Sequence, residues 1–194
     1  MLTPSRSFLP VIRRTMCAAL LMALPWLTAT PSECHDLSSP AGSSMKEGGL
    51  AFERGAFSSA LSHWKQAAEF YKNSGNTPSQ VEALVLSSQA SLGLGQSKQA
   101  LQSLELALGL AQKSGDPLVE APILGHLGRA YVTMRQLPQA SEFLQQASTL
   151  AHKQNSSPLL APTLNDLGIL FVLQQQDEKA LDAFQESVTH AERA

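Results

Sequence analysis

Residues 124–147 read LGHLGRAYVTMRQLPQASEFLQQA, and residues 164–187 read LNDLGILFVLQQQDEKALDAFQES. The two stretches lie forty residues apart and match wherever a small or a large apolar side chain recurs. The matching positions are Leu124, Leu127, Gly128, Tyr131, Ala140, Leu144 and Ala147 in the first stretch, and Leu164, Leu167, Gly168, Phe171, Ala180, Phe184 and Ser187 in the second. Self-similarity at a fixed period of this length is the sequence signature of stacked repeat units.

The repeat extends upstream, because four copies align without gaps when Ala60, Ala100, Ala140 and Ala180 are superposed. Four residues after each alanine stands a large apolar residue, and three residues further on stands a small one. The large residues are Trp64, Leu104, Leu144 and Phe184, and the small ones are Ala67, Ala107, Ala147 and Ser187. Copy two keeps Leu84 but has Ser87, Ser88 and Ser91 where the later copies have Leu, Gly and an aromatic residue. Spacings of three and four residues predict helices.

Turn and cap signals divide each copy into two helices. Gly95 and the segment 174–177 are typical of a short turn inside the unit. Helix starts are predicted where a capping residue precedes proline, and helix ends at glycine or asparagine. The starts are Thr77–Pro78, Asp116–Pro117 and Ser157–Pro158, and the ends are Gly75, Gly115 and Asn155. Each unit is therefore predicted to be an antiparallel helix pair, in which Gly128 and Ala140 let the two helices approach closely.

This pattern resembles the tetratricopeptide repeat, which places a large apolar residue, Leu-Gly, Tyr, Ala, Phe and Ala at fixed offsets. The resemblance covers residues 45–194, with repeats at about 45–75, 77–115, 117–155 and 158–194, and it is weakest in the first. It implies an all-α, right-handed α-solenoid of about four antiparallel helix pairs. The period exceeds the usual 34 residues of the family. In its forty-residue period the chain resembles kinesin-light-chain-like repeats and the arrays that precede CHAT domains.

The resemblance also implies a binding surface, because the first helices of successive units line the concave face of such arrays. The positions that carry over are Val85, Gln89, Leu92, Arg129, Val132, Thr133, Asn165, Ile169 and Val172. An apolar strip flanked by polar groups would accept an extended segment or a helix of a protein partner. Arg129 is expected to pair with a carboxylate and Asn165 with a peptide backbone. The alternative for each residue is ordinary packing or solvated surface.

The N-terminal segment has the layout of a targeting signal. Residues 1–30 carry three arginines and no acid, followed by the apolar run MCAALLMALPWL and then small residues. This order predicts a cleaved secretory signal peptide and hence a periplasmic or secreted protein, with an uncleaved membrane anchor as the alternative. Residues 31–44, PSECHDLSSPAGSS, are predicted to be a flexible linker. Without residues 1–30 the chain keeps 11 basic and 16 acidic residues, which disfavours nucleic acid as a partner.

No catalytic motif stands out in the sequence. The five histidines, His35, His63, His126, His152 and His190, are isolated and are expected to be ordinary surface residues. No metal-ligand spacing, phosphate loop or nucleophile motif is present, so no metal, cofactor or catalytic residue is predicted. The prediction is a non-enzymatic scaffold of the bacterial envelope or exterior that binds a protein or peptide. Two alternatives remain: the recognition part of a larger protein with a CHAT protease-like domain, and an oligomer that self-associates through its C-terminal repeat.

Overall fold

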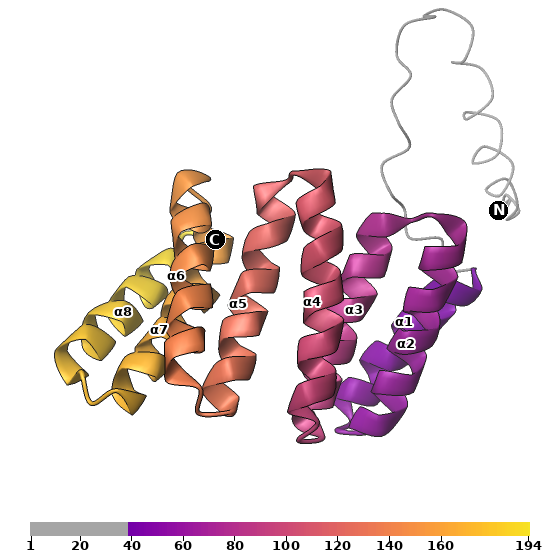
Figure 1. Ribbon diagram of the computed structural model, residues 1–194, viewed down its shortest axis with the longest axis horizontal. Coiled ribbons are helices and arrows are strands. Elements are labelled where there is room, and N and C mark those ends of the chain that lie inside the picture. Colours follow the sequence, from indigo (N-terminus) through magenta and orange to yellow (C-terminus); the bar gives the residue numbers. More distant parts are fainter. Residues whose placement is uncertain (1–38) are drawn as a thin grey trace, which may run out of the picture. The chain divides into compact units, whose positions relative to one another are not determined.

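The computed structural model describes residues 39–194, and all regular structure among them is helical (Figure 1). The helices are α1 (Pro40–Glu53), α2 (Phe57–Ser74), α3 (Thr77–Gly93), α4 (Ser97–Ser114), α5 (Pro117–Thr133), α6 (Leu137–Lys153), α7 (Ser157–Leu173) and α8 (Asp177–Ala191). The predicted all-α solenoid of antiparallel helix pairs is therefore confirmed. The predicted signal peptide and most of the predicted linker lie outside the described residues.

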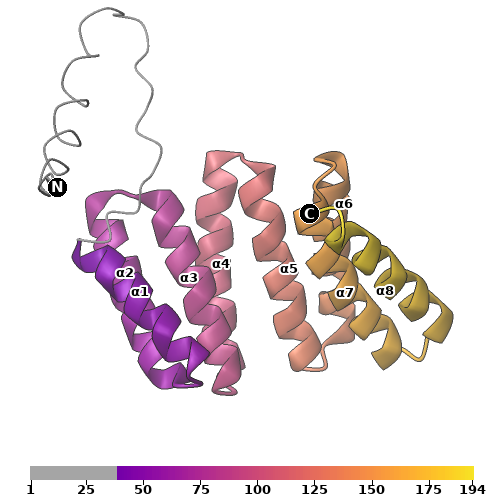
Figure 2. The same ribbon diagram turned by 180° about the vertical axis from the view of Figure 1, so that it is seen from behind.

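The helices form two layers within this unit. In Figure 1, α4 lies in front of α3 and α6 in front of α7, whereas Figure 2, seen from behind, shows α1 in front of α2 and α7 in front of α6. Each helix packs against the next in the chain, and α5 also contacts both α3 and α7. No comparable contact joins two even-numbered helices among residues 39–194. The odd-numbered layer is therefore the tighter, inner side of the array.

Positions without a side chain hold three of the four helix pairs together. A Cβ atom on Gly128 would lie 2.5 Å from Cγ of Leu144, and one on Gly168 would lie 2.5 Å from Cε1 of Phe184. The same contact recurs in the first pair, where a Cβ on Gly48 would lie 2.4 Å from Nε1 of Trp64. The predicted role of Gly128 is thus confirmed, and Gly48 shows that the weakest copy in sequence uses the same packing.

In the second pair, serine occupies the position that glycine holds in the other pairs. Ser88 stands in the register of Gly128, and its hydroxyl donates to the carbonyl of Val85 at 2.6 Å. Ser87 donates to Leu84 at 2.8 Å, and Ser91 donates to Ser87 at 2.9 Å. All three serines are fully buried. Because each hydroxyl bonds to a carbonyl of its own helix, the buried polar groups are satisfied without a partner from another helix.

The first helix begins earlier than the sequence predicts. α1 starts at Pro40, so residues 40–44 are helical where a linker was expected. Ser39 caps this helix by accepting from the backbone N–H of Gly42 at 3.0 Å, and Pro40 occupies the first helical turn. Ala41 and Met45 are buried in the core, and this packing favours helix over the coil suggested by local composition.

The other helix starts agree more closely. Asp116 caps α5 by accepting from the N–H of Leu118 at 2.9 Å, as predicted. The cap of α3 is Asn76 rather than Thr77, and it accepts from the N–H of Ser79. The N-cap position of α7 is Ser156 rather than Ser157. Helices α5 and α7 also run through Pro122 and Pro162, which lie in the second turn, so each helix lacks the hydrogen bond that an N–H at this position would make.

Every turn between helices passes through the left-handed region of backbone conformation. Glycine takes this position at residues 55, 75, 95 and 115, whereas Arg135, Asn155 and Gln175 take it in the later repeats with φ of 60°, 48° and 60°. In six of the seven turns the N–H after this residue bonds to a carbonyl five positions back, as from Gln136 to Tyr131 at 3.0 Å, whereas the N–H of Asp116 donates to Oγ of Ser114. The turn geometry is therefore common to the repeats although the residue is not.

The two adjacent glycines of α1 make a sharp test of the packing. Gly48→Ala should lower the free energy of unfolding by about 1–3 kcal/mol, because the new methyl group overlaps the buried indole of Trp64. Gly49→Ala has nothing within 4 Å and should raise stability by about 0.5–1 kcal/mol through helix propensity. Urea unfolding of the two variants beside the wild type measures both changes. Equal changes of the same sign would contradict the packing described here.

Candidate binding surface

The nine residues predicted to form a binding face all lie on α3, α5 and α7, the inner layer. Val85, Gln89, Leu92 and Val132 are half-buried. Exposed positions of the set are Arg129, Thr133, Asn165, Ile169 and Val172. Val85 and Leu92 pack against the core of the first repeats, and Val132 packs against the core of the last two. We call these nine residues the inner face.

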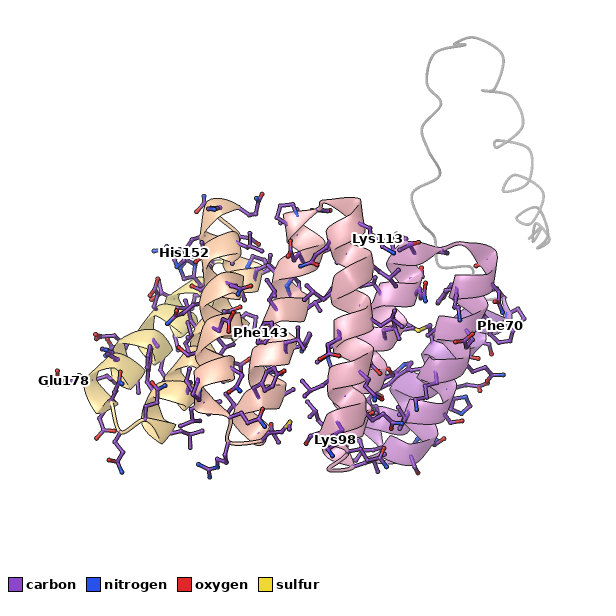
Figure 3. The ribbon with its side chains drawn as sticks, viewed as in Figure 1. Phe70, Lys98, Lys113, Phe143, His152 and Glu178 are labelled. Carbon is purple, nitrogen blue, oxygen red and sulfur yellow. The ribbon has the colours of Figure 1, made fainter. Side chains whose placement is uncertain are left out.

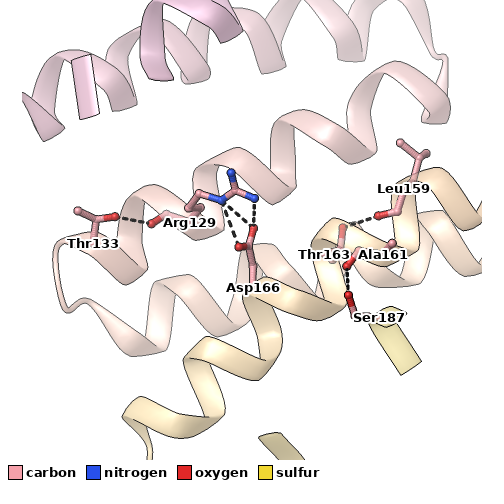
Figure 4. A network of polar contacts seen from close by, with 7 residues as sticks. All are labelled: Arg129, Thr133, Leu159, Ala161, Thr163, Asp166 and Ser187. Carbon is pink, nitrogen blue, oxygen red and sulfur yellow. Dashed lines mark hydrogen bonds and ion pairs between the residues drawn. The ribbon is translucent and has the colours of Figure 1, made fainter. Parts of the chain in front are cut away.

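Arg129 is already paired within the chain. Its Nε lies 3.1 and 3.0 Å from the two carboxylate oxygens of Asp166, and its Nη2 lies 2.9 Å from Oδ2 (Figure 4). This two-pronged contact joins α5 to α7 across the inner layer. A guanidinium held in this way has its charge neutralised locally. The carboxylate that Arg129 pairs with here is that of Asp166, within the chain.

Asp166 is the residue that sequence reasoning missed. Its side chain is only 6% exposed, whereas that of Arg129 is 45% exposed. Burial raises the pKa of Asp166, while the hydrogen bond and charge of Arg129 and a hydrogen bond from Asn165 lower it. A buried carboxylate is costly unless it is paired, so Arg129 is required where it stands. Asn165 is thus partly engaged with its neighbour, although it remains exposed at the surface.

A small cavity of about 80 Å³ opens beside the ion pair, between α5 and α7. Its lining residues are Pro122, Gly125, His126, Arg129, Leu159, Pro162, Thr163 and Asp166. His126 is half-buried here, whereas an ordinary surface histidine was expected. Burial first, and then the positive charge of Arg129, lowers the pKa of His126 to about 4. The imidazole is therefore neutral near pH 7, and the whole cluster carries no net charge.

Hydroxyl groups satisfy the helix carbonyls around this cluster. Thr133 donates to the carbonyl of Arg129 at 3.0 Å, and Thr163 donates to that of Leu159 at 2.8 Å. Ser187, which departs from the alanine of the other copies, donates from α8 to the carbonyl of Ala161 in α7 at 2.7 Å (Figure 4). This departure therefore adds a polar link inside the last helix pair.

Two wider hollows lie elsewhere on the unit. One of about 690 Å³ borders the turn between α3 and α4 together with Met134, and one of about 410 Å³ lies between α5 and α6. The second is lined by Glu120 and Glu142 among mainly uncharged side chains. Figure 3 shows side chains of the even-numbered layer, where Lys98, Lys113, His152 and Glu178 stand apart from one another. Among residues 39–194 no group of His, Cys, Asp or Glu is arranged to hold a metal ion.

Bilayer-spanning helices are long and almost wholly apolar. Within residues 39–194, none of the helices combines the length and the apolar character that crossing a bilayer requires.

Removing the cation tests the ion pair. Arg129→Ala should lower the free energy of unfolding at pH 7 by about 2 kcal/mol, since it leaves the buried carboxylate of Asp166 without its partner. Arg129→Met combined with Asp166→Leu should restore most of this loss, because an apolar pair needs no desolvated charge. Chemical denaturation of the three proteins measures the difference. A single variant as stable as the wild type would show that the contact is not structural.

The pH dependence of stability tests whether His126 is held in its neutral form. Between its ordinary pKa of 6.5 and its folded value of about 4, the unfolded chain binds a proton that the folded chain does not. Stability should therefore fall as pH drops from 7 to 4.5, by about 2 kcal/mol from this residue. His126→Gln should flatten the pH dependence. Identical pH profiles for wild type and His126→Gln would refute the burial of a neutral imidazole.

Comparisons with known proteins agree with this geometry. Two family models described as tetratricopeptide repeat match the chain, one over residues 119–193 and one over residues 81–114. No curated protein matches the sequence.

Solved structures share the fold. One, from Podosopora anserina, contains nearly identical TPR-like repeats of kinesin-light-chain type; it is 19% identical, has a TM-score of 0.64, and the match covers 80% of this chain and 78% of that one. Another is BtubC (BKLC) from P. vanneervenii, which is 16% identical and has a TM-score of 0.57; the match covers 82% of this chain and 75% of that one. At these identities the likeness concerns the fold. The two family models, the forty-residue register and the stacked helix pairs together show that the chain belongs to the tetratricopeptide-repeat family.

Proposed function

We propose that this chain is a non-enzymatic scaffold that binds a peptide segment of a protein partner on its inner face. Tetratricopeptide repeats generally mediate protein–protein interaction, and their fold is typically a non-catalytic scaffold. The observation that carries the proposal is the chemistry of the inner face, where exposed apolar side chains stand beside uncharged polar groups. Ile169 and Val172 are 40% and 50% exposed on α7, next to the exposed amide of Asn165.

The charge of this face defines the ligand further. Arg129 is the one charged residue among the nine, and Asp166 neutralises it. A face of this kind offers apolar contact and hydrogen bonds rather than net electrostatic attraction. The ligand is therefore a segment with apolar anchors and few charges, and an acidic C-terminal tail is a poor fit.

The location that we propose is the periplasm or the exterior of a bacterial cell. The support for this lies in residues 1–30, where arginines precede an apolar run and small residues follow it. Those residues are outside the described part of the chain. A partner would accordingly be found among proteins of the envelope or the surroundings of the cell.

Selection of peptide ligands tests the inner face. Phage-displayed random 15-residue peptides would be selected on a protein of residues 31–194 and their affinities measured by fluorescence anisotropy. Ile169→Arg should weaken the selected peptides at least tenfold, because it places an unpaired charge among the apolar contacts. The substitution suits the fold, since Arg129 holds the same register one repeat earlier.

A matched control separates the inner face from the outer layer. Leu106→Arg alters a leucine of α4 that is 51% exposed, and it should leave the affinities unchanged. The affinities should also change little between 50 and 500 mM NaCl, because salt screens only net charge interactions. The proposal fails if Leu106→Arg and Ile169→Arg weaken binding equally, or if binding collapses at high salt.

A further inference from the structure

The junction of α5 with α7 has different residues from the junction of α3 with α5, although both pair the same positions of the repeat. α5 contacts both of these neighbours in the inner layer. Three positions hold Val85, Leu86 and Ile123 in the earlier junction, and Gly125, His126 and Thr163 forty residues later. The three apolar residues pack in or against the core of the first repeats. The fold can therefore fill this junction with hydrocarbon, as it does one repeat earlier.

Gly125 leaves open a space that the packing does not require. A Cβ atom at this position would lie 3.7 Å from Oγ1 of Thr163, which is an ordinary van der Waals distance. At Gly128, by contrast, a Cβ atom would overlap Leu144. Glycine inside a helix is destabilising relative to alanine, so Gly125 weakens α5 without a gain in packing. The space in front of it belongs to the cavity of about 80 Å³ between α5 and α7.

This cavity opens on the inner face. Of its lining residues, Gly125, Thr163 and Asp166 are buried, whereas Arg129 and Pro162 are exposed. The exposed residues mark the mouth of the cavity, and Arg129 is itself a residue of the inner face. A group that enters the cavity therefore comes from a ligand that lies on this face.

The lining keeps unused donors and acceptors of hydrogen bonds. Nε and Nη2 of Arg129 bond to Asp166, whereas Nη1 is not bonded to this carboxylate (Figure 4). The neutral ring of His126 has one N–H donor and one acceptor nitrogen, and it forms no hydrogen bond with any of residues 39–194. The hydroxyl of Thr163 donates to Leu159, so its oxygen is left as an acceptor. A ligand group that both donates and accepts can therefore satisfy the lining.

Charge argues against an ionised ligand group. A carboxylate in the cavity would lie beside Asp166, and an ammonium group would lie beside Arg129. Since Asp166 and Arg129 neutralise each other, neither ion would gain a net attraction in return for the water it loses. The group that fits is therefore neutral.

The volume selects among neutral groups. A water molecule takes up about 30 Å³ in the liquid, so a cavity of about 80 Å³ has room for two or three groups of that size. The hydroxymethyl group of serine would leave part of this space empty, whereas the CH₂–CO–NH₂ group of asparagine matches it. Pro122, Leu159 and Pro162 provide apolar contact for the carbon atoms. A primary carboxamide accepts through its oxygen and donates through its NH₂ group.

We propose that the cavity between α5 and α7 is a carboxamide pocket, which binds the end of an asparagine or glutamine side chain of the peptide on the inner face. The oxygen of the carboxamide accepts from the guanidinium of Arg129. Its NH₂ group donates to the ring of His126 and to Oγ1 of Thr163. The inference rests on the proposed function for the source of the group. It adds that one position of the peptide is selected by hydrogen bonds rather than by apolar contact.

Acetamide is the probe for the pocket itself, because it is the asparagine side chain without a backbone. Residues 36–194 form a compact unit of their own, so a protein of residues 31–194 is suitable. A probe this small binds weakly, so NMR of ¹⁵N-labelled protein follows the Nε–H of Arg129 and the ring of His126. Acetone has the same shape without the donors, and acetate has the same shape with a charge. Acetamide should give saturable shifts with a Kd at least fivefold lower than that of either.

The cavity-filling variant is Gly125→Val, which places Val85 of the second copy in the register of the third. Gly125→Ala is a milder change whose Cβ atom the packing accepts. The matched control is Gly109→Val, at an exposed glycine of α4 with nothing within 4 Å of the Cβ position. Acetamide should bind wild type and control equally and Gly125→Val at least fivefold more weakly, with Gly125→Ala in between. Circular dichroism checks that each variant is folded, and Gly125→Ala decides the test if valine is not accepted.

The peptides selected on the inner face test the source of the carboxamide. They should share an asparagine or glutamine, and its replacement by leucine or aspartate should weaken binding to wild type at least tenfold. On Gly125→Val the original and the leucine version should bind with equal affinity, because no pocket remains to distinguish them. Ile169→Arg should weaken the peptides but not acetamide, so the pocket and the apolar contacts are measured separately.

Three results would overturn the assignment. If acetamide gives no saturable shift, or if acetone or acetate binds as tightly, the cavity is not a carboxamide pocket. If Gly125→Val and Gly109→Val weaken acetamide equally, the site of binding lies elsewhere. If peptides bind without a need for asparagine or glutamine, the pocket takes no part in recognising them. Failure to select any peptide would instead count against the proposed function and the peptide as source, while the acetamide titration still decides the chemistry of the pocket.

Discussion

The close approach of paired helices over a missing side chain is the constraint on which the structure depends. Gly48, Gly128 and Gly168 lie against Trp64, Leu144 and Phe184, at distances that leave no room for a methyl group. Each large side chain thereby becomes the spacer of its pair, and the alanine four residues before it is buried. Because this contact fixes the two helices along their length, it determines which residues are left on the inner layer and which on the outer one.

The repeat and its register could be predicted because both are local in the sequence. Ala100, Ala140, Leu104 and Leu144 are all fully buried, and their helical spacing alone indicates this. The start of α1 could not be predicted in the same way, since Ser39 to Gly42 have the composition of a linker. Their helical state comes from the cap and from burial against α2, and neither is visible in composition.

The polar cluster of the inner layer was hidden for a different reason. Arg129 and Asp166 are 37 positions apart, so they do not share a register of the forty-residue repeat. Asp166 instead shares the register of His126, and this is the signal that could have revealed the cluster. The first helices of two neighbouring repeats do not place equivalent residues side by side. Residues forty apart have equivalent positions in the packing, whereas residues that touch between neighbouring repeats, such as Arg129 and Asp166, are separated by a few residues more or fewer than forty.

From sequence alone, an arginine on the inner layer of such an array is easily taken for a residue that binds a ligand. Here the side chain completes the structure, because Asp166 is buried and requires a cation. The consequence for recognition is that the inner face keeps apolar and hydrogen-bonding groups without net charge. On α8, by contrast, the exposed residues Asp177 and Glu178 form no salt bridge with any side chain of residues 39–194.

The repeats supply an internal reference for interpreting this difference. A residue exposed in one copy can be compared with its equivalents in three others, under the same backbone geometry and the same helix packing. Val188 replaces Ser148, and Glu192 replaces His152, at positions where the fold itself accepts either residue. Leu181 and Val188 keep the apolar residues that Leu101 and Leu108 provide in the second copy, so their chemistry follows from the repeat. Only their exposure differs, because Leu101 and Leu108 pack against the core of the first repeats. A comparison between copies thus separates what the repeat requires of a residue from what its neighbours do to it.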